Sequence, residues 1–177
     1  MTVSGMARRA TTPPVTFSAT VLATFSATVV AGIAVATAPP AHADYNRFNN
    51  GLAQSVYGVK HQAGCTTDLK MNPALNQAAQ WHADDVLNNR NLDGDIGSNG
   101  ANAQDRAQAA GYRGTVAETI AIQPQLSPNG LQVLNDWYNR PDYYAIMSNC
   151  ANIQIGVRTS TNGLDRTVIV AVYGQPG

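Results

Sequence analysis

Residues 166–173 read RTVIVAVY, a nearly continuous run of apolar and mostly β-branched side chains. A run of this kind is typical of a strand that is buried on both faces at the centre of a sheet. Residues 152–159 read NIQIGVRT and alternate apolar with polar side chains, which predicts a second strand. Asn162-Gly163 lies between the two runs, and this dipeptide favours a tight turn. The end of the chain therefore predicts an antiparallel hairpin.

The sequence between residue 44 and this hairpin predicts helices around one further strand. That strand is expected over residues 115–122, which are apolar and partly β-branched. Helices are expected over residues 45–59, 73–89 and 103–110, and from Ser127-Pro128 to the residue before Pro141. This order of elements predicts the α+β fold class, with helices covering a small, mainly antiparallel sheet.

The last of these helices carries several large side chains. Leu131, Leu134 and Tyr138 recur along one side of it and are expected to face the core, together with Trp137. Tyr143 follows the break at Pro141, where its amphipathic ring suits either the wall of a cleft or ordinary packing.

The first 43 residues have the composition of an export signal. Arg8 and Arg9 give a positive start, an apolar stretch diluted by Ser, Thr and Ala follows, and Ala41-His42-Ala43 fits a cleavage site. Cleavage between Ala43 and Asp44 would leave residues 44–177 as one domain of a secreted protein, located outside the cell or in its envelope. The alternative is an uncleaved anchor, since residues 15–37 are long enough to span a bilayer.

The part after residue 43 carries nine basic and eleven acidic residues. This near balance argues against a nucleic-acid-binding protein and against a polybasic membrane-surface protein. The two cysteines, Cys65 and Cys150, are too few for a four-cysteine zinc site. In an oxidising compartment they are expected to form a disulfide. A reactive thiol is the alternative, but no neighbouring residue indicates a lowered thiol pKa. We expect a monomer.

Five segments in this order resemble the bacterial branch of the CAP superfamily, also called the SCP domain, which groups cysteine-rich secretory, antigen 5 and pathogenesis-related 1 proteins. The segments are LKMNPALNQAAQWHADDVLNNRNL (69–92), DIGSNGANAQDRAQAAGY (95–112), VAETIAI (116–122), DWYNRPDYYAIM (136–147) and IQIGV (153–157). The resemblance covers roughly residues 45–174. It implies an α-β-α sandwich with a shallow cleft over the central sheet.

In this family the cleft usually holds two histidines and one or two acidic residues, and in some members the histidines bind a divalent metal. Asp95 stands at the first histidine position, in the segment DIGSNG, and Tyr143 stands at the second, after WYNRPD. The family's strand glutamate matches Glu118. Arg140 stands where many eukaryotic members carry another glutamate. The resemblance thus implies a degenerate cleft lined by these four residues.

Glu118 has two interpretations. Its strand parity places it on one face with Val116 and Ile120, where an unpaired carboxylate is costly. It is either a retained cleft acid with a raised pKa that works with Asp95, or a buried glutamate bonded to backbone amides, Tyr143 or Arg140. We favour the buried glutamate, because a general-acid pair needs a second group in an opposite environment and Asp95 is the one candidate.

No metal and no other cofactor is expected. His82 lies on the apolar row of the helix predicted over residues 73–89 and is expected to be a packing residue, with a ligand role as the alternative. His61, near the end of the first helix, is expected to face solvent. Asp95, Glu118 and Tyr143 offer at best a weak, oxygen-rich site for Ca²⁺ or Mg²⁺.

The sequence therefore favours a secreted CAP/SCP-domain protein that binds a ligand without catalytic turnover, and it leaves residual enzymatic activity undecided. The candidate ligands are an envelope glycan, a lipid or a protein. Two alternatives remain: a metal-independent hydrolase using Asp95 and Glu118, and a weakly metal-dependent CAP protein.

Overall fold

The computed structural model describes residues 45–124 and 128–177. The expected export signal, its cleavage site and the expected helix start at Ser127 lie outside the described residues. The helices are α1 (Asn46–Gln62), α2 (Pro73–Asn88), α3 (Ala103–Ala109), α4 (Gly130–Tyr138) and α5 (Pro141–Ser148), and the strands are β1 (Lys70–Met71), β2 (Gly114–Gln123), β3 (Gln154–Thr161) and β4 (Thr167–Pro176).

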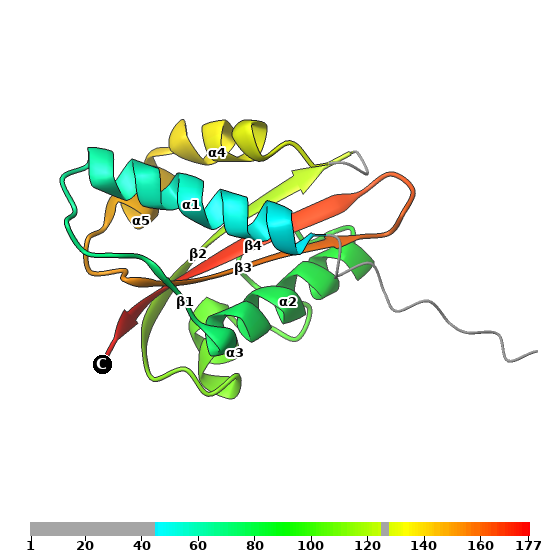
Figure 1. Ribbon diagram of the computed structural model, residues 1–177. Coiled ribbons are helices and arrows are strands. Elements are labelled where there is room, and N and C mark those ends of the chain that lie inside the picture. Colours follow the sequence, from blue (N-terminus) through cyan, green and yellow to red (C-terminus); the bar gives the residue numbers. More distant parts are fainter. Residues whose placement is uncertain (1–44, 125–127) are drawn as a thin grey trace, which may run out of the picture. The chain divides into compact units, whose positions relative to one another are not determined.

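These elements form three layers. Helices α1, α4 and α5 lie on one side of the sheet, and α2 and α3 lie on the other (Figure 1). The predicted α+β class and the α-β-α sandwich that the resemblance implied are both confirmed. Among the described residues, no helix is long and apolar enough to cross a membrane.

The sheet has the strand order β1-β3-β4-β2. Strand β4 pairs antiparallel with both β3 and β2, and its residues from Thr167 to Gly174 are all buried. The predicted hairpin and the predicted central strand are therefore confirmed. Strand β1 pairs parallel with β3 and was not predicted, because a two-residue strand is too short to show a periodic pattern. The free edges of the sheet are β1 and β2.

Capping chemistry fixes where α2 and α3 begin. The Asn72 side chain accepts hydrogen bonds from the backbone N–H groups of Ala74 and Leu75, and Pro73 fills the first helical position. Asn102 and Asp105 form a reciprocal capping box at the start of α3. Since these signals are local, the sequence predicted both helix starts to the residue.

Helix α4 buries a different side from the one predicted. Val133 and Trp137 are 0% and 1% exposed, whereas Leu131 is 73% and Tyr138 45% exposed. The core position expected for Trp137 is confirmed, and those expected for Leu131 and Tyr138 are wrong. A helix of nine residues is too short for its apolar side chains to mark a single face. The packing of α4 against α1 and β2 decides which face is buried.

Helix α5 was not predicted. Its first residue is Pro141, before which the sequence predicts the end of the preceding helix. Proline ends a preceding helix but is also favoured at the first position of a new one, because its missing N–H has no helical partner there. The new helix carries Tyr143 to the free edge of β2.

The predicted disulfide is present between Cys65, after α1, and Cys150, after α5, with a Cα–Cα distance of 5.2 Å. Next to it, the Lys60 ammonium donates a hydrogen bond to the backbone carbonyl of Asn149. Lys60 is 1% exposed, and burial lowers its pKa. A covalent and a polar link thus join the C-terminal ends of α1 and α5.

We predict that replacing both cysteines by serine lowers the free energy of unfolding by about 4–5 kcal/mol. The bridge closes a loop with a sequence separation of 85 residues, and its loss restores the chain entropy of that loop to the unfolded state. The melting temperature should fall by roughly 15 °C. Urea unfolding of the double variant, with the reduced wild type as control, measures the free energy, and thermal unfolding of the same two proteins measures the melting temperature. An unchanged unfolding midpoint would show that the bridge contributes no stability.

Candidate functional site

The cleft that contains the predicted site residues has a volume of about 660 Å³. It lies along the free edge of β2 and is walled by residues from both helical layers: Asp93, Gly94, Asp95, Ile96, Asn102, Ala103 and Gln104 on the α3 side, and Arg140, Asp142, Tyr143 and Ile146 from α5 and its N-cap. Val116, Ala117, Glu118 and Ile120 of β2 form its floor. The cleft therefore lies at one edge of the central sheet, with β2 as its floor.

The acid in this floor is paired with an arginine. The Arg106 Nη2 atom lies 3.0 and 3.1 Å from the two carboxylate oxygens of Glu118. The side chains of Arg106 and Glu118 are 8% and 2% exposed. The same guanidinium donates to the backbone carbonyls of Asp95 and Ala101, each at 2.7 Å. Arg106 therefore fixes both the acid and the loop that walls the cleft.

His82 of α2 also contacts Glu118. Its Nε2 lies 3.3 Å from the Glu118 Oε1 atom and 2.9 Å from the carbonyl oxygen of Gly94. The Nδ1 atom is buried without a hydrogen-bond partner in the described part of the chain. We therefore assign the neutral imidazole with its proton on Nε2, where it donates toward both oxygens.

The two titratable groups have opposite pKa shifts. Burial raises the pKa of Glu118 to about 7, against the opposing effect of Arg106, and Asp95 adds to the rise. Burial lowers the pKa of His82, and the charge of Arg106 lowers it further. A proton on Nδ1 would have no acceptor, which agrees with a neutral imidazole. Near neutral pH the cluster therefore carries the positive charge of Arg106, a neutral His82, and a Glu118 carboxyl group close to the midpoint of its titration.

The four residues predicted for the cleft line it, but they are not joined to one another as expected. Asp95 is exposed, and its backbone carbonyl, not its carboxylate, contacts Arg106. Arg140 donates to Asp142 at 2.7 Å and stacks on Tyr143, with 3.6 Å from its Cζ to the ring centroid. The expected bonds from Glu118 to Tyr143 or Arg140 are replaced by the contacts with Arg106 and His82.

Sequence reasoning missed the roles of Arg106 and His82. Both lie on the buried side of a helix among alanines: Arg106 shares that side of α3 with Ala103 and Ala107, and His82 precedes the buried Ala83 in α2. A charged or polar residue on an apolar helix face signals a buried partner. The sequence does not show which strand residue faces it, so the partner became visible with the packing of α3 against β2 and of α2 against β4 and α3.

The metal that the family resemblance implies does not fit these residues. At the two expected histidine positions Asp95 offers an exposed carboxylate, and the Tyr143 hydroxyl accepts from the Ile120 N–H. The Glu118 carboxylate is held by Arg106, and His82 Nε2 by Gly94 and Glu118. Across residues 45–124 and 128–177, no three His, Cys, Asp or Glu side chains are arranged to hold a metal.

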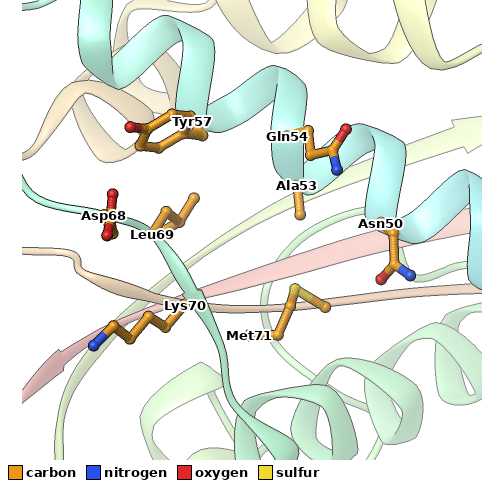
Figure 2. A pocket seen from close by; sticks show the side chains of 8 residues that line it. All are labelled: Asn50, Ala53, Gln54, Tyr57, Asp68, Leu69, Lys70 and Met71. Carbon is orange, nitrogen blue, oxygen red and sulfur yellow. The ribbon is translucent and has the colours of Figure 1, made fainter.

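A second hollow, of about 620 Å³, lies between α1 and the segment from Asp68 to Met71 (Figure 2). Tyr57 projects from α1 toward this segment, and Met71 lies below the helix. The two charged lining residues, Asp68 and Lys70, are exposed. This hollow lacks a buried titratable cluster like that of the β2 cleft, which makes the β2 cleft the candidate site.

Comparison with known proteins identifies the family of this chain. Residues 44–173 match the family model described as CAP, the cysteine-rich secretory protein family. The chain belongs to the CAP family. In a search of curated proteins, no sequence matches it.

Two solved structures share the CAP fold with this chain at low sequence identity. An outer surface protein of Borrelia burgdorferi is 17% identical with a TM-score of 0.63, over 76% of this chain and 96% of its own. An extracellular SCP-domain protein of Bacillus anthracis is 16% identical with a TM-score of 0.61, over 78% of this chain and 45% of its own. Since the chain spans less than half of the latter, the similarity concerns its SCP domain.

The raised pKa of Glu118 predicts a pH-dependent stability difference between the wild type and Glu118→Gln. The folded carboxyl has a pKa of about 7 and holds its proton up to that pH, whereas the unfolded one releases its proton near the ordinary glutamate pKa of 4.5. Between these values the folded state binds more protons, so its stability falls as the pH rises. The wild type should lose roughly 3 kcal/mol relative to the variant between pH 4.5 and 7.

Urea unfolding of both proteins across this pH range measures the difference, and a constant difference would contradict the shifted pKa. The carboxyl carbon resonance of Glu118 gives a second measurement that needs no variant. Its chemical shift should titrate with a midpoint near pH 7.

The poor fit of the donors predicts that divalent ions do not stabilise the protein. Any ion that binds the native state but not the unfolded state must raise the melting temperature. At about 1 mM, Zn²⁺, Ca²⁺ and Mg²⁺ should each change the melting temperature by less than about 1 °C. A concentration-dependent rise that Asp95→Asn abolishes would instead support a metal-dependent CAP protein.

Proposed function

We propose that this CAP-family chain is exported, is cleaved after Ala43, and acts through residues 44–177 as a monomeric binding module outside the cell or in its envelope. The ligand site is the β2-edge cleft, lined by Asp95, Glu118, Arg140 and Tyr143. The extracellular and outer-surface descriptions of the two structural neighbours support the location.

One observation carries the binding role: the acid in the cleft floor is locked in a structural pair. Glu118 is 7% exposed, and Arg106 holds both of its carboxylate oxygens. A general acid or base must exchange its proton with a substrate atom within hydrogen-bonding reach. Moving Glu118 toward a substrate would break the Arg106 contact and leave a buried charge unpaired, which costs about 3–5 kcal/mol.

The cleft surface suits binding more than turnover. Arg140 and Tyr143 form a stacked cation–aromatic pair at its wall, and Ile120 and Ile146 add apolar area. Asp93 and Asp95 add exposed carboxylates. The cleft wall thus combines apolar side chains with fixed polar and charged groups, which can orient a bound ligand. The combination fits an envelope glycan, a lipid headgroup or a protein segment.

The proposal is tested by following the backbone amide resonances of the labelled protein during titration. The probes are soluble peptidoglycan fragments, vesicles of anionic and of zwitterionic lipid, and short peptides. At least one class should shift the resonances of cleft residues such as Gly94 and Tyr143. Arg140→Gln should then weaken that binding about tenfold, because the stacked guanidinium is lost.

Arg90→Gln is the matched control. Arg90 and Arg140 both form exposed 2.7 Å ion pairs, with Asp165 and Asp142 respectively. Either substitution should change stability by less than about 1 kcal/mol. Binding that falls equally in both variants, or titrations in which cleft resonances do not move, would refute the cleft as the ligand site.

A further inference from the structure

The outer edge of β2 is closed by side chains at two places. The Gln104 side chain donates to the Gly114 carbonyl at 2.9 Å and accepts from the Val116 N–H at 3.0 Å. The Trp137 indole donates to the Ile120 carbonyl at 3.0 Å, and the Ile120 N–H donates to the Tyr143 hydroxyl. All four of these main-chain groups belong to even-numbered residues.

This parity identifies the groups that remain open. In an antiparallel ladder the two main-chain groups of one residue point to the same side, and successive residues alternate between sides. The register of β2 on β4 is continuous from Gly114 to Gln123, so no bulge shifts the alternation. The N–H and C=O groups of Glu118 therefore face the free edge, as does the carbonyl of Val116.

These three groups form a window between the two capped positions. In the described part of the chain, none of them has a hydrogen-bond partner. The window opens into the cleft, because Val116, Ala117, Glu118 and Ile120 all line it. Open main-chain groups on the edge of a sheet can pair with an added strand, so this row in the cleft points to a ligand with complementary main-chain groups.

An extended peptide supplies such groups. In an antiparallel arrangement, a residue placed beside Glu118 can accept from its N–H and donate to its carbonyl, and a residue two positions away can donate to the Val116 carbonyl. In a parallel arrangement, the residues before and after that position make these bonds instead. A segment running in either direction makes three hydrogen bonds with the window. The caps at Val116 N–H and Ile120 limit this pairing to about three residues.

Charge indicates which side chains the segment carries. In the cleft, Arg140 is paired with Asp142, and Arg106 lies behind Glu118. Asp93 and Asp95 are exposed at its wall and have no ion-pair partner among the described residues. The cleft therefore presents uncompensated negative charge beside the window, which favours a basic side chain.

We propose that an extended, basic peptide segment of a partner protein adds to the sheet at Glu118, as a short strand on the free edge of β2. This inference rests on the proposed function, in which the same cleft is the ligand site. It narrows the ligand from three classes to a protein segment held chiefly through its backbone.

The opposite edge of the sheet gives an internal comparison. The N–H groups of Lys70 and Asn72 donate to the carbonyls of Ile153, just before β3, and of Ile155 in β3, so the main-chain groups of Met71 face outward on β1. That edge borders the hollow between α1 and residues 68–71, where Lys70 offsets Asp68 (Figure 2). A basic peptide should therefore prefer Glu118 to Met71.

The probe is the blocked peptide acetyl-Val-Lys-Val-Lys-Val-amide, titrated into the labelled protein. Its binding should slow hydrogen exchange at the Glu118 amide at least tenfold and leave the Met71 amide unchanged. Protection at Met71 instead, or at neither amide, would overturn the proposal. The same peptide with Glu in place of Lys should bind at least tenfold more weakly.

Methylation of peptide nitrogens separates strand addition from simple charge attraction. One peptide carries N-methyl groups on both lysines and the other on the central valine. Because alternate residues face the protein edge, one of the two should lose at least tenfold in affinity and the other should bind like the parent. Equal binding of both methylated peptides would show that no strand forms.

Protein variants complete the test. Asp95→Asn should weaken the basic peptide roughly two- to fivefold, as expected for an exposed ion pair, and the matched Asp68→Asn at the other hollow should not. If glycan or lipid probes shift cleft resonances while the peptide gives no Glu118 protection, strand addition is wrong and the binding cleft stands. If none of the probes reaches the cleft, both proposals fall.

Discussion

The pairing of Arg106 with Glu118 holds together the parts of the molecule that make the cleft. One guanidinium bonds the carboxylate of a strand, the carbonyl of Asp95 at the cleft wall and the carbonyl of Ala101 before α3. Both side chains are almost fully buried, so each charge depends on the other for compensation. The loop from residue 93 to 102 has little regular structure of its own and is positioned by these contacts.

The same pairing determines what the cleft offers a ligand. Because the carboxylate points back to Arg106 and His82, the cleft receives from Glu118 mainly its backbone groups. Around them, Gln104, Trp137 and Tyr143 bond neighbouring main-chain groups of the strand. The family resemblance singled out Glu118 for its carboxylate. In the proposed interaction, the main-chain N–H and C=O groups of Glu118 are more important than its side chain.

The imidazole in this site illustrates how local and tertiary information differ. The resemblance placed the family's histidines at positions 95 and 143, and both are replaced by other residues. His82 reaches the acid from α2 and is fully buried, beneath the cleft. The sequence predicted its burial correctly. The apolar pattern of a helix shows which side faces the core but not which residue that side contacts, so the contact of His82 with Glu118 could not be predicted.

The sequence by itself determined the elements with local signals: the hairpin, the central strand, the capped starts of α2 and α3, and the family. It also indicated the disulfide, since the export signal expected from the sequence predicts an oxidising compartment, where two cysteines have one way to pair. Tertiary structure decided the buried side of α4, the strand β1 and the partners of Glu118. These depend on contacts between segments far apart in the chain, and a periodic pattern carries no information about which distant surface will cover it.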